Sequence, residues 1–340
     1  MKRRYIGVDL HRDCFTACVR QENGKETLRD WKLDQLAEFL KTLRSSDEVA
    51  VEVSGNTRFF YDAVGPRVSK VVVVNTTEFR VISESVKKTD ANDARALALF
   101  LSKGMLPEVR LKDKNRLQVA SLAQTRESLV RLRTALKNKI NGMLSAQGMN
   151  LKREALASDR RLEAILKMKF DPVQQAELQV IVEQIRSLNG SIRKLEIIID
   201  DHGRKLEGYR NIRSIKGTGS LNGPVLLSVI GDANDFPDEG KLASYFGIVP
   251  RVDQSNQTRR MGSITRRGNK LARTALIQSA LIAKRYSSYL DSYYQRIKKR
   301  RGAGRAIIAL ARKFLGIIYR TLKNNWIFED FTTFTLASKV

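Results

Sequence analysis

The order of the apolar segments in the first 75 residues constrains the fold of this chain most strongly. Three segments that are typical of strands come first, Tyr5–Leu10, Cys14–Arg20 and Lys25–Trp31. The second and third alternate apolar and polar residues, as strands with one buried face do. A helical pattern over about Leu33–Leu43 follows, and then two short valine-rich segments, Val49–Val53 and Val71–Val74. We therefore predict three consecutive strands, followed by strands that alternate with helices.

That order is typical of the RNase H-like, or RuvC-like, fold. A doubly wound nucleotide-binding fold needs a glycine-rich phosphate loop after its first strand, and this chain has none there. The start Ile6-Gly7-Val8-Asp9 also opens the sugar kinase and actin-like ATPase fold. In that fold small residues follow the strand, whereas Leu10-His11-Arg12-Asp13 is bulky and charged. Failure to bind ATP would exclude this alternative.

The middle of the chain is expected to be helical. Apolar residues recur at alternating spacings of three and four, which is the heptad pattern of a coiled coil: Leu178, Ile181, Ile185, Leu188, Ile192, Leu195 and Ile199. An earlier helix, roughly Asn115–Gln147, carries apolar residues on one face, namely Leu122, Leu129, Leu132, Leu136, Ile140 and Met143. The two helices either pack as an antiparallel hairpin, with Asp171-Pro172 near the turn, or pair with another protomer.

The C-terminal part begins near Gly208 and is predicted to be small and mainly helical. Ile215–Gly219 precedes a helix at Pro224–Ile230 and resembles a helix-hairpin-helix element, whose glycines let backbone amides approach a phosphate. A polar loop, Arg251–Arg267, precedes helices near Leu271–Tyr289 and Ala306–Lys323. The fold class is thus α/β plus α, with predicted domains at 1–112, 113–207 and 208–340.

The charge of the chain indicates its partner. Lys and Arg number 62 against 36 acids, a formal net charge of +26, and such an excess binds polyanions by releasing counterions from phosphates. No stretch has the uncharged length of a membrane helix, and the start is no signal peptide. The two cysteines, Cys14 and Cys18, have no partner ligands elsewhere, which favours a reduced compartment. We expect a cytoplasmic, nucleoid-associated protein of prokaryotic type with no membrane contact.

Four acids are the candidate metal ligands. Asp9 ends the first strand, Glu52 ends a second buried strand, and Asp90 and Asp93 lie three residues apart at a predicted helix start. Neighbouring strands and a helix packed over their ends would bring these carboxylates together, where they repel one another unless cations neutralise them. Oxygen ligands of this kind favour Mg²⁺, and a pair of ions suits phosphoryl transfer. Each acid alone has a structural explanation, since Asp90 and Asp93 also favour a helix N-terminus.

Several blocks of the sequence, in order along nearly the whole chain, resemble the insertion-sequence 110 family of transposases, which are bridge-RNA-guided recombinases related to Piv-type DNA invertases. The blocks are Ile6–His11, Val51–Asn56, Lys88–Arg95, Ser214–Gly219, Leu242–Pro250 and Gly262–Asn269. The first three look like that family's Asp-Glu-Asp-Asp blocks, and the others look like its C-terminal transposase domain.

The resemblance implies a specific activity. A RuvC-like domain would bind divalent metal, a coiled coil would join it to the transposase domain, and a serine there would form a covalent phosphoserine with DNA. By its position after Pro250 in the family's pattern, that serine is Ser255. Small residues often follow the serine in the family, whereas Asn256 and Gln257 follow it here. A noncoding bridge RNA would select donor and target DNA, and a homo-oligomer (dimer or tetramer) would hold two active sites together.

Elementary chemistry bears on Ser255 as well. A serine hydroxyl needs a base or a metal to become nucleophilic, and no histidine adjoins this one, so we expect activation by metal or carboxylate. Ser263 is the second candidate, although a helix N-cap before Ile264 also explains it. Basic and glycine residues of the C-terminal part are the predicted nucleic-acid contacts: Lys216, Gly217, Gly219, Arg251, Arg259, Arg260, Arg266, Arg267 and Lys270.

Further candidates and two alternatives remain open. The cluster Lys298–Gly302 also suits phosphate, and Tyr286, Tyr289, Tyr293 and Tyr294 either stack on bases or pack between helices. A RuvC-like hydrolytic DNA junction nuclease would share the carboxylates and use water instead of serine. A nucleic-acid-binding protein without catalysis would share the charge alone.

Overall fold

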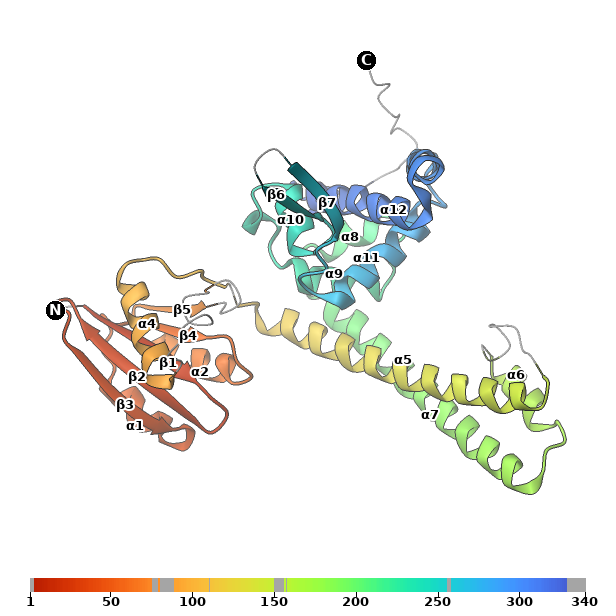
Figure 1. The fold of residues 1–340 in the computed structure, drawn as a ribbon, viewed down its shortest axis with the longest axis horizontal. Helices are drawn as coiled ribbons and strands as arrows, with labels where there is room; N and C mark the ends of the chain where they lie inside the picture. The colour runs from red at the N-terminus through yellow and green to blue at the C-terminus, as the bar shows by residue number, and fades with distance from the viewer. Residues whose placement is uncertain are drawn as a thin grey trace, which may run out of the picture. The chain divides into compact units, whose positions relative to one another are not determined.

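A computed structural model describes residues 3–74, 79, 89–109, 111–149, 156, 158–255 and 258–328, without the side chains of residues 253–261. Contacts divide the chain into two compact units, Met1–Leu111 and Lys112–Val340 (Figure 1). The two long middle helices share a unit with the C-terminal helices, and the finer division at 207 remains a prediction. None of the described helices is long and apolar enough to cross a membrane.

The first unit is built on a mixed sheet whose described strands run in the order β3-β2-β1-β4-β5. Its strands are β1 (Arg4–Leu10), β2 (Cys14–Gln21), β3 (Glu26–Lys32), β4 (Glu48–Glu52) and β5 (Lys70–Val74). The first three pair antiparallel, whereas β4 pairs parallel with β1 and with β5. The five predicted strands are confirmed, and their order is compatible with an RNase H-like domain.

Helices cover both faces of this sheet (Figure 1). On one face, Ile6 and Val8 of β1 join an apolar cluster with α1 (Leu36–Thr42) and α2 (Thr57–Val64), where Phe15 stacks edge-on against Phe39 and Phe60. The opposite face carries α4 (Asp90–Ser102), which packs on β1, β2 and β4. Short 3₁₀ turns, η1 (Leu33–Gln35) and η2 (Gly65–Arg67), complete the described elements.

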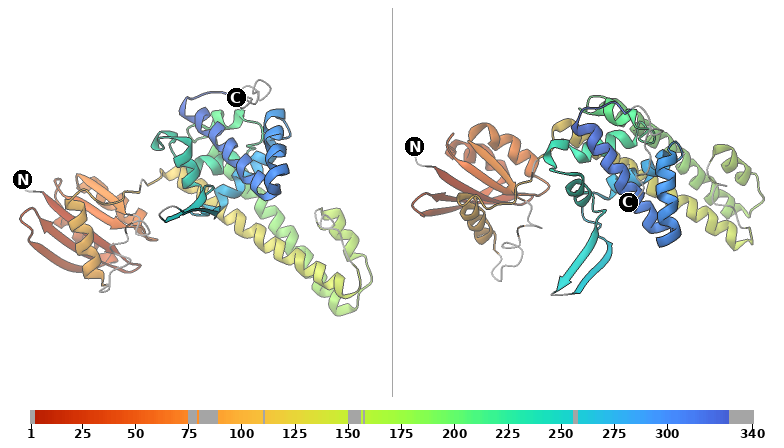
Figure 2. Two further views of the ribbon diagram at one scale, coloured as in Figure 1. Left: turned by 45° about the horizontal axis from the view of Figure 1, so that its top comes forward. Right: turned by 90° about the horizontal axis from the view of Figure 1, so that it is seen from above.

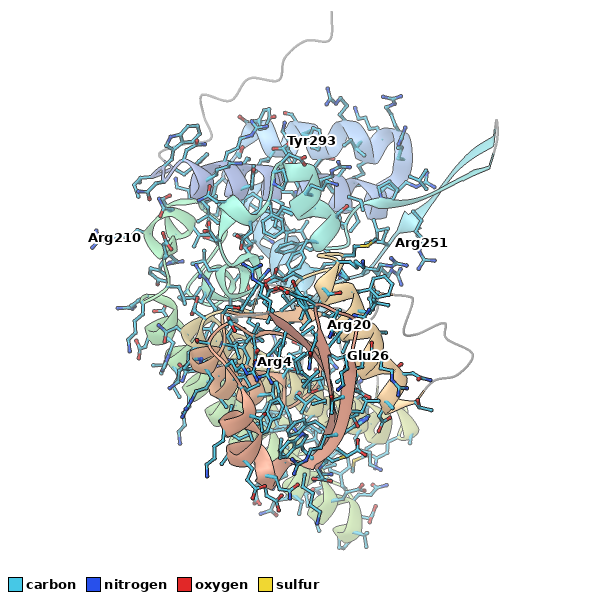
Figure 3. The ribbon with its side chains drawn as sticks, turned by 90° about the vertical axis from the view of Figure 1, so that its left-hand side faces the viewer. Arg4, Arg20, Glu26, Arg210, Arg251 and Tyr293 are labelled. Carbon is cyan, nitrogen blue, oxygen red and sulfur yellow. The ribbon has the colours of Figure 1, made fainter. Side chains whose placement is uncertain are left out.

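Ion pairs connect strands of this unit to one another and to the segment before β4. The guanidinium of Arg4 donates to both oxygens of Asp47, at 2.9 and 2.6 Å, and the Asp47 side chain is fully buried. Arg20 on β2 pairs with Glu26 on β3, and both are labelled in Figure 3. A buried carboxylate held by two charge-assisted hydrogen bonds is stable only with its partner present. The Arg4–Asp47 pair therefore anchors the start of β1.

The predicted long helices form an antiparallel pair, α5 (Lys114–Ala146) and α7 (Pro172–Gly203) (Figure 2). Arg126 of α5 bonds to Glu196 at 2.6 Å, and Lys139 further along α5 reaches Glu177 at 3.1 Å. The α7 residues of the predicted seam are buried or half-buried inside the chain. Leu132, predicted on the buried face of α5, is instead 56% exposed. The hairpin alternative is thus the arrangement that the chain adopts.

The cap of α7 follows the sequence prediction. Asp171 accepts hydrogen bonds from the amides of Val173 and Gln174 at 3.0 and 3.1 Å, and Pro172 occupies the first turn. Proline suits this position because the first-turn amide has no intrahelical acceptor. A short helix, α6 (Asp159–Leu166), comes between the two long helices in the sequence and packs on α7.

The C-terminal helices share one apolar core with α9 (Asn222–Ile230), which is buried from Gly223 to Ile230. They are α8 (Tyr209–Ser214), η4 (Ala233–Asp235), α10 (Glu239–Tyr245), α11 (Lys270–Ala283) and α12 (Ser288–Lys323). The last is two helices joined at Gly302, whose φ of 80° interrupts the helical backbone. The predicted helix Leu271–Tyr289 is wrong in its length, because α11 ends at Ala283 and Ser287 caps α12.

The predicted polar loop Arg251–Arg267 is wrong, because most of it is a β-hairpin. Its strands are β6 (Pro250–Ser255) and β7 (Thr258–Ile264), paired antiparallel. Val252 is 50% exposed, and exposed strand residues give no apolar alternation to detect. Ser263 lies within β7, so its interpretation as an N-cap is also wrong. Asn269 caps α11 by accepting from the Ala272 amide at 3.1 Å.

Candidate metal centre and basic surface

Asp9 and Glu52 stand at neighbouring ends of parallel strands. Val8 of β1 pairs with Val51 of β4, so the two acids follow the last paired residues. Successive side chains of a strand point to opposite faces. Gly7 and Ala50, two residues before each acid, both face α4. Both acids therefore belong to the sheet face that α4 covers.

The first turn of α4 supplies the other two acids. Thr89 begins the helix, and its side chain accepts from the Asn92 amide at 3.3 Å. Asp90 is exposed at the helix start, whereas Asp93 is 6% exposed and faces the sheet side. Acids in a first turn are favoured by the helix dipole, but a buried one needs a further reason.

The carboxylates of Asp9 and Asp90 meet at His11. The His11 Nε2 lies 3.3 Å from Asp9 Oδ2 and 3.2 Å from Asp90 Oδ2. One ligand atom from each of these three residues lies within 4.8 Å of the others. Glu52, at the half-buried end of β4, and Asp93 lie outside this group. The structure thus brings two of the predicted ligands together at His11, whereas the other two lie outside this group.

The electrostatics of the cluster favour a cation. Burial raises the pKa of Asp9, His11 opposes that shift, and the carboxylates of Asp90 and Asp93 raise the pKa further. Only 5% of Asp9 is exposed. A divalent cation would relieve this repulsion, and carboxylate oxygens suit Mg²⁺ or Mn²⁺. The donor set therefore fits a divalent metal.

His11 was missed by sequence reasoning, which used it only as part of a motif. Its amide donates to Cys14 O at 2.9 Å, which closes the turn after β1. The Asn56 side chain donates to the carbonyls of His11 and Arg12 at 3.1 and 2.8 Å. These bonds hold the imidazole beside Asp9. An imidazole two residues after a strand-end acid was the available signal, but its partner on α4 is visible only in the folded chain.

The β6–β7 hairpin carries the predicted nucleophile. The backbone of Ser255 pairs with Thr258 at the end of the hairpin. The side chains of Ser255, Arg259 and Arg260 lie outside the described part, as does Lys88 of the third motif block. Arg251, labelled in Figure 3, is exposed at the base of the hairpin.

Three more of the predicted nucleic-acid contacts lie in or just after the turn that follows β7. Arg266, Arg267 and Lys270 are exposed, and close backbone packing fixes the turn. A Cβ on Gly247 would lie 1.9 Å from Arg267 O, and one on Gly268 would lie 2.1 Å from Tyr245 O. The turn is therefore held in one conformation while its basic side chains face solvent, which suits phosphate contact.

The predicted nucleic-acid contacts in the 215–221 loop differ in their exposure and packing. Lys216 and Gly219 are exposed. Gly217 instead packs flush on α11, where a Cβ would meet Ser279 O at 2.6 Å, and its φ of +110° favours glycine. The tyrosines also separate, since Tyr294 is buried in the core whereas Tyr286 is 57% exposed.

Comparison with known proteins agrees with these features. Residues 6–148 match a transposase model for the DEDD domain of the IS110 type. Residues 209–295 match the model described as transposase IS116/IS110/IS902 family.

Two relatives resemble the chain over almost its whole length. The transposase for insertion sequence element IS1111A of Coxiella burnetii is 26% identical, covering 94% of this chain and 89% of the relative. The pilin gene-inverting protein of Moraxella bovis is 25% identical, covering 97% and 98% respectively.

The fold, the carboxylate cluster and the matches to transposases and an invertase together define the class of this protein: it is an enzyme that recombines DNA. The match to the DEDD domain indicates use of a divalent metal. Within that class, the two matched domains show that this chain belongs to the IS110 family of transposases.

Proposed function

We propose that this transposase cuts and rejoins DNA through a covalent phosphoserine at Ser255, with Mg²⁺ held by Asp9, Glu52, Asp90 and Asp93. The single observation that carries the proposal is the meeting of Asp9 and Asp90 at His11. Its setting supports the same activity, since the cluster lies at the strand ends of a domain that matches DEDD transposases.

The chain's own residues have separate tasks in this proposal. Asp9 is fixed by its strand, Asp90 and Asp93 by the cap of α4, and Glu52 by the end of β4. His11 would keep the Asp9 and Asp90 carboxylates at a set separation. When bound, a pair of Mg²⁺ ions would stabilise charge on the entering and leaving oxygens. Oxygen ligands from rigid elements suit that task, because small misplacements are costly in rate.

The proposed strand transfer conserves the phosphodiester bond energy. The Ser255 oxygen would form a bond to phosphorus, its proton would pass to a base, and the bond to the leaving sugar oxygen would break as that oxygen gains a proton. Arg251 of β6 and Arg266, two residues after β7, are exposed and suit the added charge on the phosphate. Attack by the freed hydroxyl of another strand would then release the serine.

The experiment that tests the proposal traps the covalent intermediate. Wild-type protein on a nicked DNA substrate with Mg²⁺ should retain DNA after denaturation, and peptide mapping should locate the phosphate at Ser255. Ser255→Ala should bind DNA and form no adduct, because it lacks the attacking oxygen. Ser263→Ala, on the same hairpin, is the matched control and should form the adduct normally.

The outcomes separate the proposal from its alternatives. An adduct mapped to Ser263 or a tyrosine would keep a recombinase and reject Ser255. Hydrolysis without any adduct would favour the junction nuclease, and a failure to cleave with Mg²⁺ would favour a binding protein without catalysis.

We further propose a noncoding bridge RNA as guide and a homo-oligomer as the active form. The net charge of +26 supports a large nucleic-acid complement. Exposed apolar residues on the helical pair support self-association, namely Leu132, Val180 and Ile197. RNA that copurifies from the native host should be one discrete species encoded near the gene. A random transcript pool would reject the guide and leave a protein-guided transposase.

A further inference from the structure

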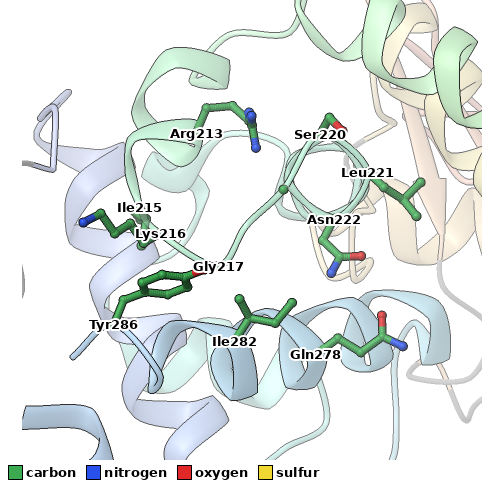
Figure 4. A pocket seen from close by; sticks show the side chains of 11 residues that line it. Arg213, Ile215, Lys216, Gly217, Ser220, Leu221, Asn222, Gln278, Ile282 and Tyr286 are labelled. Atoms are coloured by element: carbon green, nitrogen blue, oxygen red, sulfur yellow. The ribbon is translucent and has the colours of Figure 1, made fainter. Parts of the chain in front are cut away.

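A cavity of about 640 Å³ opens between the 215–221 loop and α11 (Figure 4). Its volume lies in the range of pockets that hold small organic ligands, about 300–1,000 Å³. None of its lining residues belongs to the carboxylate cluster or to the β6–β7 hairpin. The cavity is therefore separate from the groups proposed for strand transfer.

Two cations stand at the opening of the cavity. Arg213 and Lys216 are exposed, and no carboxylate within the described ranges lies at ion-pairing distance from either. In Figure 4, Arg213 points across the opening toward Ser220, whereas Lys216 lies on the side of Tyr286. The Lys216 Nζ is 5.9 Å from the centre of the Tyr286 ring. This side of the cavity favours an anionic group such as a phosphate.

The wall formed by α11 and the turn after it has a different character. Tyr286 and Ile282 are 57% and 40% exposed, although both are large and apolar. An aromatic ring beside an aliphatic side chain suits the flat face of a nucleobase. Gln278 and Asn222, on neighbouring sides (Figure 4), carry amides that can both donate and accept at a base edge.

The loop that forms the cavity is preorganised. Gly217 packs against the backbone of α11, since a Cβ added to this glycine would lie 2.6 Å from the Ser279 carbonyl oxygen. Thr218 is fully buried, and its hydroxyl lies 2.6 Å from Ile212 O and 2.9 Å from Ile215 O. A fixed loop keeps the cavity open without the cost of ordering it on binding.

We infer that this cavity holds one unpaired nucleotide of a single-stranded nucleic acid, with its base on Tyr286 and its phosphate at Arg213. The inference deepens the proposed function and rests on its claim that the chain handles opened nucleic-acid strands. Bases in a duplex are stacked on their neighbours and cannot present a free face to the ring. The site would therefore discriminate single strands from duplexes.

The test uses the full chain in EDTA and a single-stranded DNA oligonucleotide with one 2-aminopurine. Fluorescence of the probe should be quenched on binding, and Tyr286→Ala should remove that quenching and weaken binding about tenfold. Tyr286→Phe retains the ring and should bind as wild type. Phe59→Ala, at an aromatic residue that is equally exposed and lies outside the cavity, is the matched control. Binding of a duplex of the same sequence should change by less than about twofold in every variant.

Equal losses on single strand and duplex, or no loss from Tyr286→Ala, would overturn the inference. The same measurement with an RNA oligonucleotide of the same sequence shows whether the nucleotide comes from DNA or from RNA. A loss of affinity of Tyr286→Ala for single-stranded DNA, for RNA or for both supports the pocket. A missing Ser255 adduct would not alter this result, because the probe is measured in EDTA, where no strand transfer takes place. Failure of the proposed chemistry is thus distinguishable from failure of the pocket.

Discussion

At the scale of single residues, Asp9 is the position where folding and function conflict. Its carboxylate is buried against two other acids, and burial is the main cause of its raised pKa. A raised pKa means that the metal-free fold binds a proton more tightly than the unfolded chain does. Metal-free stability should therefore fall as pH rises from the ordinary aspartate value through the folded pKa.

Replacing Asp9 should expose that conflict. We predict that Asp9→Asn raises the melting temperature of the protein in EDTA at pH 7 and lowers recombination by at least about a hundredfold. Addition of Mg²⁺ should stabilise the wild type, more so as pH rises, and have little effect on the variant. Thermal melts with and without Mg²⁺ measure this, and an equal Mg²⁺ shift in both proteins would contradict the metal site.

At the scale of elements, the contact between β1 and α4 builds the site. A Cβ on Gly7 would lie 2.1 Å from Ala94 O and 2.4 Å from the Ala98 amide nitrogen. Only a glycine lets the helix lie this close to the strand. That contact brings the first turn of α4, with Asp90 and Asp93, over the end of β1.

A methyl group at Gly7 should displace α4. We predict that Gly7→Ala lowers the free energy of unfolding by about 1–3 kcal/mol and reduces recombination along with it. Gly65→Ala is the control, because nothing lies within 4 Å of its added Cβ. Chemical denaturation of both variants measures the difference, and equal stability would show that α4 has room to shift.

At the scale of the whole molecule, the net charge of +26 governs binding to nucleic acid. We predict that affinity for DNA falls about a thousandfold or more between about 50 and 200 mM salt. Arg267→Ala should reduce the slope of log affinity against log salt by about one, because this side chain is exposed. Arg320→Ala should leave the slope unchanged, since Arg320 already pairs with Glu239 at 3.0 Å. A flat salt dependence would assign the charge another role.

The sequence by itself determined the elements of this protein and much of its identity. Local periodicity encodes which face of a segment is buried, so the sheet strands, the two long helices and the start of α4 at Asp90 were predictable. The β6–β7 hairpin was not, because those of its side chains that the structure describes, such as Arg251, Val252 and Ser263, are exposed and give no apolar alternation.

Only the tertiary structure decided which groups meet. Asp9 and Asp90 meet at His11 because α4 packs on β1 at Gly7, and no local pattern records a contact between segments so far apart in the chain. The same holds for Tyr286, which faces a cavity while nearby Tyr294 is buried. Residue type fixes what each side chain can do, whereas long-range packing fixes its partners and its exposure.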